Sequence, residues 1–300
     1  MSEGDRRSQV FAVGLLGGQA ALVTGGGTGL GRATALELVR CGADVTIAGR
    51  RVEVLEEAVA EIGASASGDE AGSIGYVAGD IRDREDARRL VGAVLDRGGR
   101  LDLLVNNAGG QFFSPAELIA AKGWRAVWRL NVEGMLNMAE AAFELALGRA
   151  EADGSGGGGM VVNVTLSPHH GMPGMAHSGA ARATVEALTR ELAQRWESAG
   201  VAVTAVAAGT FETDVLAKYP ANVRAGAARS VPLQRLGSAA EHAWLVALLA
   251  SPLGRAFNGS TITLDGARDN WFGPWPPPGL ADAGGTVPVE ERRPGAAAAG

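Results

Sequence analysis

The stretch Gln19–Gly31 reads QAALVTGGGTGLG: a short apolar run, a cluster of glycines, and the start of an amphipathic segment. The apolar run predicts a buried strand, and the spacing over Leu30–Arg40 predicts a helix. Glycines between a strand and a helix permit a tight turn and let the backbone approach a pyrophosphate, which the helix N-terminus attracts. Because the chain holds 45 glycines, the cluster carries weight only in this strand–turn–helix context.

The same alternation of strand and helix continues along the chain. Further strands are predicted at Asp44–Ala48, Ile74–Ala78, Leu101–Asn106, Met160–Thr165, Val201–Ala207 and Thr261–Asp265. Further helices are predicted at Val52–Ile62, Asp83–Asp96, about 122–147, Ala181–Ser198 and near Ala239–Ala250. Seven buried strands separated by helices indicate an α/β fold with a doubly wound parallel sheet and right-handed crossovers.

Composition narrows the class of protein. With 300 residues, 46% apolar and 20% charged, the chain can bury one large core. A net charge of −6 disfavours a nucleic-acid partner, and no apolar run reaches the length that spans a membrane. The lone Cys41 excludes an internal disulfide and a cysteine-rich metal site, and no acidic residues are spaced for a metal. Without an N-terminal signal segment, we expect a cytoplasmic protein.

The chain ends differ in character from the body. We predict a short extension over residues 1–11, one domain over 12–268, and a tail over 269–300. The tail is rich in Pro, Gly and Ala and cannot build a core, so it is expected to be disordered, with Trp271 and Trp275 able to tuck a short part of it onto the body.

Two short segments indicate which dinucleotide binds. Arg50 and Arg51 follow the second predicted strand, where an acidic residue would bind the ribose hydroxyls of NAD and an arginine suits a 2′-phosphate. The sequence therefore favours NADPH over NADH, with Arg50 the better candidate; the alternative is a pair of solvated residues that open the next helix. Asp80 and Ile81 follow the third strand, where Asp80 either bonds the adenine or caps a helix.

Asn106-Asn107-Ala108-Gly109 follows the fourth strand, and Asn131 and Gly134 lie in the next helix. Together with Thr24–Gly31, these residues resemble the short-chain dehydrogenase/reductase family over about residues 12–268. The resemblance implies a single Rossmann-type domain that forms a homodimer or homotetramer, through the helices at 122–147 and 181–198. Motifs and resemblance together predict these cofactor-binding residues: Thr24, Gly25, Thr28, Gly29, Leu30, Gly31, Arg50, Arg51, Asp80, Ile81, Asn107, Ala108, Gly109, Arg182, Gly209, Thr210 and Thr213.

Two longer segments narrow the resemblance. Leu104–Trp124 and Gly171–Ala183, with its string His-Ser-Gly-Ala-Ala-Arg, resemble peroxisomal trans-2-enoyl-CoA reductases and bacterial relatives of the citronellol/citronellal dehydrogenase type. The dienoyl-CoA reductases are more distant in this comparison. The resemblance thus implies a small-molecule substrate, with an acyl-CoA as the leading candidate.

The usual active site of that family holds Asn, Ser, Tyr and Lys. Here the corresponding residues are Asn131, Thr165, Ser178 and Arg182, so Tyr-x-x-x-Lys reads Ser-x-x-x-Arg. The chain has only two tyrosines: Tyr76 is expected in the core, and Tyr219 in the segment that covers the substrate in this family. Arg182 can still bind ribose hydroxyls, because it keeps the charge and adds donors.

The missing tyrosine affects some reactions more than others. A simple carbonyl needs a proton at its oxygen as the hydride moves, and a serine supplies one poorly. An enoyl thioester instead builds enolate charge on its oxygen, which hydrogen-bond donors such as Thr165 and Ser178 can stabilise. The sequence therefore favours NADPH-dependent reduction of a trans-2-enoyl thioester.

Two alternatives remain open. An alcohol, aldehyde or ketone oxidoreductase would need another proton donor, for which His177 and Tyr219 are candidates. His177 could instead face a subunit interface or a helix cap, while His169 and His170 are expected to be exposed loop residues. The other alternative is a cofactor-binding partner subunit without turnover. Lys218, Arg224 and Arg229 either meet the phosphates of CoA or are surface charges.

Overall fold

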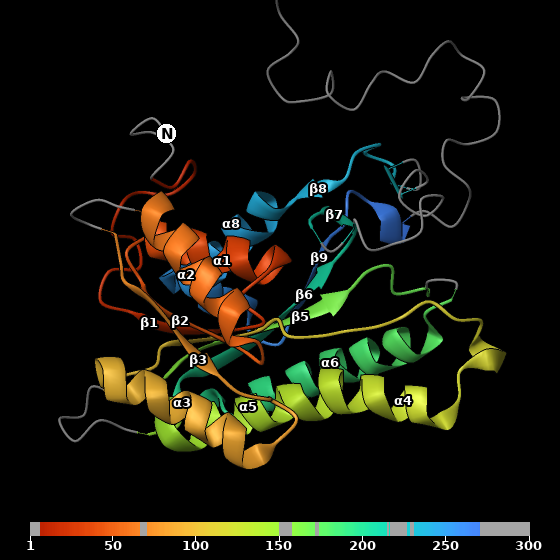
Figure 1. Cartoon of the computed structure of the whole chain (residues 1–300), viewed down its shortest axis with the longest axis horizontal. Coiled ribbons are helices and arrows are strands. Elements are labelled where there is room, and N and C mark those ends of the chain that lie inside the picture. The colour runs from red at the N-terminus through yellow and green to blue at the C-terminus, as the bar shows by residue number, and fades with distance from the viewer. Residues whose placement is uncertain are drawn as a thin grey trace, which may run out of the picture.

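The computed structural model describes residues 7–66, 71–149, 158–171, 174–214, 216, 227–228 and 231–270. Seven strands form one sheet in the order β3-β2-β1-β4-β5-β6-β9, and every neighbouring pair is parallel (Figure 1). The strands are β1 (Ala20–Thr24), β2 (Asp44–Gly49), β3 (Ile74–Ala78), β4 (Leu103–Asn106), β5 (Gly159–Leu166), β6 (Val201–Ala208) and β9 (Thr261–Leu264). The predicted doubly wound α/β sheet of seven strands is confirmed.

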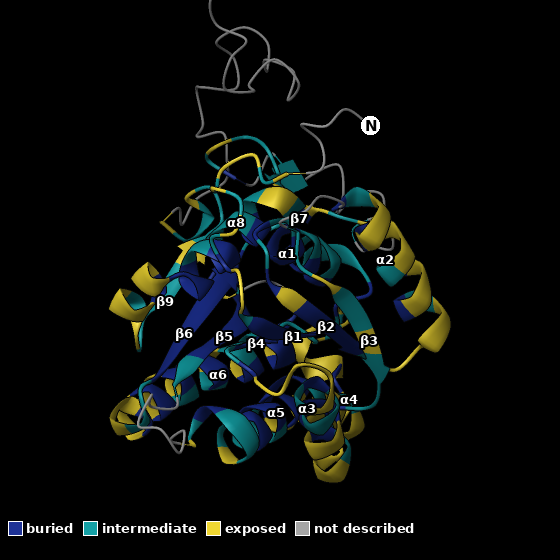
Figure 2. Ribbon diagram, turned by 90° about the vertical axis from the view of Figure 1, so that its left-hand side faces the viewer, coloured by how far each residue is buried: buried dark blue, intermediate teal, exposed yellow. Residues whose placement is uncertain are grey.

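Helices cover both faces of this sheet. In Figure 1, α1, α2 and α8 lie on one side and α3, α5 and α6 on the other, with α4 beside α6. The α-helices are α1 (Gly29–Arg40), α2 (Val52–Ser65), α3 (Arg84–Gly98), α4 (Ala121–Trp128), α5 (Gly134–Ala142), α6 (Ala176–Arg195) and α8 (Ala239–Ala250). Because the central strands touch helices on both faces, β1, β4 and β6 are buried along their whole length (Figure 2).

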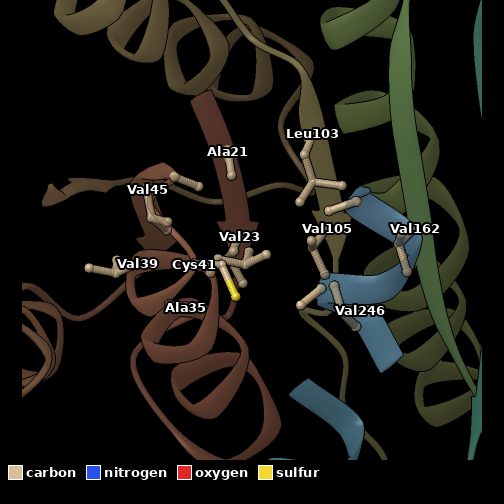
Figure 3. Close-up of a cluster of buried hydrophobic side chains, with 14 of the residues drawn as sticks. Ala21, Val23, Ala35, Val39, Cys41, Val45, Leu103, Val105, Val162 and Val246 are labelled. Carbon is tan, nitrogen blue, oxygen red and sulfur yellow. The ribbon is translucent and has the colours of Figure 1, made fainter. Parts of the chain in front are cut away.

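Two apolar clusters hold the layers together. Val23, Val105 and Val162 point toward α1 and α8, in the cluster that also contains Cys41 (Figure 3). Their neighbours Leu22, Leu104 and Val161 point the other way, toward α3, α5 and α6. This alternation follows from the two-residue period of a strand, and each fully buried Val or Leu contributes about 1.5–3 kcal/mol.

The strand order places a site at one edge of the sheet. The chain leaves β1 for β2 on one side, whereas it leaves β4 for β5 on the other. Loops therefore diverge beyond the carboxyl ends of β1 and β4, where open α/β sheets bind ligands.

Three elements differ from those predicted. The helix predicted from Ala181 begins at Ala176, because Ser178 and Gly179, weak helix formers, obscured its first turn. The helix predicted over 122–147 is divided by two π-helical segments, η3 (Arg129–Glu133) and η4 (Phe143–Leu147). A short parallel pair, β7 (Phe211–Glu212) with β8 (Gly237–Ser238), was not predicted at all.

The prediction that Tyr76 lies in the core is wrong. The residue is 39% exposed, and its hydroxyl donates to Glu56 Oε1 at 2.8 Å. The reason is its place on β3, an edge strand whose flank no further strand covers.

The chain ends are described only in part. Phe11, in the predicted extension, packs against the core, and Ser8 Oγ donates to Glu37 Oε1 at 2.5 Å. At the other end the short helix η9 (Arg268–Asn270) is the last described element, so the structured body continues past residue 268. Trp271, Trp275 and the rest of the predicted tail lie outside the described residues. Within the described residues, no helix is long and apolar enough to cross a membrane.

Candidate active site

The glycine turn after β1 is fastened to the end of β4. Thr24 Oγ1 accepts from the backbone N–H groups of Asn107 and Ala108, at 3.1 and 3.0 Å. Asn107 Nδ2 donates back to the carbonyl oxygen of Thr24 at 2.9 Å. A Cβ on Gly31 would lie 2.4 Å from both the Gly25 oxygen and Asn107 Nδ2, so only glycine lets α1 start this close to the turn.

A cleft of about 750 Å³ opens where these two strands end. Its wall is built from the glycine turn, the ends of β2, β4, β5 and β6, and the loops that follow them. Predicted site residues on this wall are Gly25, Thr28, Gly29, Leu30, Arg50, Arg51, Asp80, Ile81, Asn107, Ala108, Gly109, Thr165, Arg182, Gly209, Thr210 and Thr213. Four predicted site residues are not on the wall: Thr24, Gly31, Asn131 and Ser178.

One end of the cleft is basic. Arg50 and Arg51 are exposed at the end of β2 and line the wall there. Asp80 lies opposite, but its carboxylate accepts from Arg82 Nε at 2.9 and 3.0 Å. This hydrogen bond from Arg82 lowers the pKa of Asp80, against a smaller opposing effect of burial. Asp80 is therefore ionised and partnered by Arg82, and its pKa is also lowered by the charge of Arg50. Arg50 and Arg51 give this end of the cleft a positive charge that suits an anion.

Asn131 organises the loop after β4 without reaching the cleft. It lies in the π-helical segment η3, and its Nδ2 donates to the carbonyl oxygens of Val127 and Gly110 at 2.8 and 2.9 Å. Its Oδ1 accepts from the backbone N–H of Gly110 at 3.2 Å. π-Helical turns recur at functional sites, and here one places a buried amide against the backbone that forms the floor of the cleft.

Ser178 is fully buried on the first turn of α6, and its hydroxyl is turned toward another side chain. Ser178 Oγ donates to Gln111 Oε1 at 2.9 Å. Gln111 itself is on the wall of the cleft. Ser178, which the sequence analysis aligns with the family tyrosine, therefore contacts the described wall through Gln111.

Arg182 occupies the centre of the wall. Its Nη1 donates to the carbonyl oxygen of Val164 at 2.8 Å, while its Nε is buried and has no hydrogen-bond partner among the described residues. A Cβ on Gly109 would lie 2.3 Å from Arg182 Nη2, so a larger residue there would displace the guanidinium. No ion pair joins it to a carboxylate in the described part of the chain, and burial lowers the pKa of Arg182 to about 10.

Thr165, at the end of β5, also has its hydroxyl committed. Thr165 Oγ1 donates to Glu186 Oε1 at 2.8 Å, two turns along α6 from Ser178. Thr165 is 3% exposed but lies on the wall. Both hydroxyls expected to polarise a substrate therefore donate to protein acceptors.

The histidines lie in three different settings. His177 is buried between Phe112 and Trp124, with ring centroids 4.3 and 6.0 Å away, and is not on the wall. His169 and His170 are exposed, as expected, yet His169 contacts both Glu186 and Asp269. Tyr219, Lys218, Arg224 and Arg229 lie outside the described residues.

Several wall residues escaped the sequence analysis. Gln111, Phe113, Ser167, Met175, Phe211 and Arg268 line the cleft, and Ser167 Oγ donates to Asp265. Glu186 was also missed, although its place four residues after Arg182 puts both on one face of α6, a spacing that could have revealed it. Among the described residues, no group of three His, Cys, Asp or Glu side chains could hold a metal ion.

Comparison with known proteins agrees with this geometry. The family model described as short chain dehydrogenase matches residues 19–224. A peroxisomal 2,4-dienoyl-CoA reductase of Arabidopsis thaliana is 34% identical over 264 residues, covering 85% of this chain and 86% of the relative. A probable 2,4-dienoyl-CoA reductase of Bacillus subtilis is also 34% identical, covering 86% of this chain and 98% of the relative.

Among solved structures, a citronellol catabolism dehydrogenase of Pseudomonas aeruginosa superimposes with a TM-score of 0.75 at 40% identity, covering 87% of this chain and 98% of that one. The family model spans more than half of the chain, and the relatives and the sheet order agree with it. The chain therefore belongs to the short-chain dehydrogenase/reductase family of oxidoreductases, and it is related to the enoyl-CoA and dienoyl-CoA reductases within it.

Proposed function

We propose that this protein reduces a conjugated, α,β-unsaturated acyl-CoA thioester with NADPH. The observation that carries the proposal is Arg182: a guanidinium on the cleft wall with a buried, unpartnered Nε and no carboxylate partner among the described residues. A cation in this setting favours negative charge that develops on a bound substrate. A tyrosine, which simple carbonyl reduction requires in this family, is absent from the described wall.

The residues present fit an NADP dinucleotide. Gly31 lets the helix N-terminus approach a pyrophosphate, and the Arg182 side chain on the cleft wall suits ribose hydroxyls. Arg50 and Arg51 would hold the 2′-phosphate, while Asn107, Ala108 and Gly109 would flank the nicotinamide half. When bound, the cofactor supplies the hydride. The 2,4-dienoyl-CoA reductases among the relatives support this choice of cofactor and of substrate class.

The remaining chemistry would be performed by Arg182, Thr165 and Ser178. Reduction of a conjugated thioester adds hydride at a carbon remote from the oxygen and leaves enolate charge on the oxygen. Arg182 would stabilise that charge electrostatically, since its pKa of about 10 keeps it charged at neutral pH. Thr165 lies next to Val164, whose carbonyl holds the guanidinium, and would act on the same oxygen. Ser178 would keep Gln111 oriented toward the substrate.

A second candidate function is oxidation or reduction of an alcohol or aldehyde. The 40% identity to a citronellol catabolism dehydrogenase favours it. This chemistry needs a group that exchanges a proton with the substrate oxygen, and His177 does not reach the wall. The third candidate is a catalytically inactive NADPH-binding subunit. The experiment below distinguishes it from the two enzymes.

We also propose that the protein forms a homodimer or homotetramer through α4, α5 and α6. Trp124 and Trp128 on α4 are 37% and 40% exposed, and Leu118 just before it is 70% exposed. Large exposed apolar side chains grouped on one helix are typical of a surface that another subunit covers.

The deciding experiment follows NADPH oxidation by absorbance with trans-2-enoyl-CoA and 2,4-dienoyl-CoA thioesters of several chain lengths. Citronellal, and citronellol with NADP⁺, form the matched second panel, and cofactor binding is measured on the same sample by fluorescence. Turnover of a thioester is expected. Turnover only in the second panel overturns the thioester assignment in favour of the alcohol dehydrogenase, and tight binding without turnover in either panel overturns it in favour of the inactive subunit.

A further inference from the structure

A continuous chain of polar side chains connects the cleft with solvent. Thr165 Oγ1 donates to Glu186 Oε1 at 2.8 Å, and His169 Nε2 contacts the same carboxylate oxygen at 3.0 Å. The other ring nitrogen, His169 Nδ1, lies 2.5 Å from Asp269 Oδ2. Three separate elements meet here: the end of β5 with the loop after it, the middle of α6, and η9.

Exposure rises step by step along this chain. Thr165 is 3% exposed, the Glu186 side chain 11%, and the His169 side chain 34%. Thr165 alone of these residues is on the cleft wall. The chain thus begins at a buried hydroxyl on the cleft wall and ends at an ionisable ring that is partly exposed to solvent.

We propose that His169 and Glu186 form a proton path that supplies Thr165, and through it the substrate, in place of the missing tyrosine. The inference rests on the proposed function, because it assigns the proton that this reduction consumes. The proton path explains why the Thr165 hydroxyl donates to Glu186 and not into the cleft. When Glu186 is ionised, the hydroxyl donates to it. When Glu186 carries a proton, the hydroxyl can donate to the substrate.

The proton balance closes. Hydride addition forms a new C–H bond on the unsaturated chain and leaves the former double-bond electron pair on the thioester enolate. His169 first passes its proton to the ionised Glu186. The enolate carbon then takes the proton of Thr165, forming a second new C–H bond, while Thr165 takes the proton from Glu186. His169 regains a proton from solvent, so each residue ends with the protons with which it began.

The charges around His169 suit this role. Burial lowers the pKa of His169, but the hydrogen bond to Asp269 and the charge of Glu186 outweigh it, so the net pKa is raised. His170 Nδ1 also faces Asp269, at 3.5 Å, and Arg268 and Asp265 stand in the same loop, with the Asp265 carboxylate accepting from the Arg268 and Asp269 backbones. A raised pKa extends to higher pH the range in which the ring is protonated and able to donate.

The two hydroxyls expected to polarise a substrate differ in their partners. Ser178 donates to Gln111, whose amide does not ionise, whereas Thr165 donates to the carboxylate of Glu186. Of these two hydroxyls, Thr165 is the one bonded to a titratable side chain.

The test compares His169→Gln and Glu186→Gln with the unsubstituted protein, and His170→Gln serves as the matched control on the adjacent residue. Rates are measured from pH 5.5 to 9.5 with the thioester that the panel identifies. We expect kcat to fall about 100-fold in the first two variants and NADPH affinity to stay unchanged. In the unsubstituted protein kcat falls as pH rises through the raised pKa of His169, and this dependence disappears in His169→Gln.

Two readouts separate a proton path from a structural contact. Imidazole added to His169→Ala is expected to restore kcat, because the histidine site is open to solvent. Independently of turnover, NMR titration is expected to show that Glu186→Gln lowers the pKa of His169, the signal being assigned with His169→Gln. If His169→Gln and Glu186→Gln have the same rate and pH profile as the unsubstituted protein, the proton path is overturned. The proposed reductase activity is not affected by that outcome. Absence of thioester turnover by the unsubstituted protein overturns both.

Discussion

Arg182 Nη1 donates to the carbonyl oxygen of Val164 at 2.8 Å, which fixes a guanidinium at the end of β5, beside the carboxyl end of β4. The sequence analysis aligns Arg182 with the family lysine, whose ammonium is a compact point charge, whereas the planar guanidinium of arginine spreads its donors. Nη1 donates to the Val164 carbonyl, whereas the buried Nε has no hydrogen-bond partner among the described residues. Burial disfavours the charged form of this guanidinium and lowers its pKa to about 10.

Removing the charge of Arg182 is expected to raise the free energy of unfolding and to lower the affinity for NADPH. In Arg182→Met, the free energy of unfolding without ligand should rise by roughly 1–3 kcal/mol, because a desolvated charge without a carboxylate partner is removed. NADPH affinity should fall at least tenfold, since ribose hydroxyls lose their donor. Denaturant unfolding and fluorescence titration measure the two quantities on one sample.

The matched control is Arg190→Met, an exposed arginine two turns along the same helix. It should change neither quantity by a measurable amount, as expected of surface positions. A loss of unfolding free energy in Arg182→Met would instead mean that its bond to Val164 outweighs the cost of burying the charge.

Ser178→Ala probes the contact with Gln111. The substitution leaves Gln111 Oε1 without its donor, and we expect kcat to fall by up to about tenfold through misorientation of the amide. KM for NADPH should stay constant, because Ser178 is not on the cleft wall. Ser178→Thr, which keeps the hydroxyl, tests the assignment: its kcat should exceed that of Ser178→Ala, and equal values would remove the role of the hydrogen bond.

Much of the fold could be predicted because its strands are buried on both faces. Val201–Ala207 and Gln19–Thr24 are short apolar runs between glycine-rich turns, and the structure places strands there within one residue. The long helix was less predictable: nothing in the residues around Asn131 reports a π-helical turn, which depends on the loop after β4 donating to and accepting from the Asn131 amide. Tyr76 was wrongly predicted to lie in the core, because the residues of a strand do not indicate its position in the sheet, and β3 lies at the edge.

The site was predictable where motifs are local and not where contacts cross the fold. The glycine turn and the Asn107–Gly109 loop follow strands directly, so their residues were identified from short motifs and the family resemblance. The pairing of His169 with Glu186 and Asp269 joins residues 17 and 100 positions apart, and no periodicity reports such distances. Likewise, the direction of the Thr165 and Ser178 hydroxyls depends on acceptors that only the packed structure brings near.

Arg50 is expected to determine the choice of dinucleotide. In Arg50→Ser, NADPH affinity should fall about 10- to 100-fold through loss of a charge-assisted hydrogen bond, while NADH affinity stays constant. Fluorescence titration with both cofactors supplies an internal control, because NADH differs only in the missing 2′-phosphate. An equal loss for both cofactors would show that Arg50 supports the turn and not the phosphate; Arg51→Ser, measured in parallel, locates the remaining contribution.

His242 makes the stability of the fold depend on pH. The ring is fully buried on α8, with Nδ1 3.3 Å from Thr34 Oγ1 on α1, and burial lowers its pKa to about 4. Since the unfolded chain binds this proton more readily, the contribution is complete above about pH 6.5 and is lost as pH falls toward 4, up to about 3 kcal/mol. His169, with its raised pKa, contributes in the opposite sense and partly offsets this.

Denaturant unfolding from pH 4.5 to 7.5 measures this dependence, and His242→Gln is the informative variant. Glutamine keeps a polar group beside Thr34 but does not titrate in this range, so the free energy of unfolding should become flatter with pH even if its value at pH 7.5 falls. His169→Gln, which removes the opposing contribution, should make the dependence steeper. A His242→Gln variant with the full slope would show that α1 and α8 part before the ring is protonated, and that other groups set the acid limit of the fold.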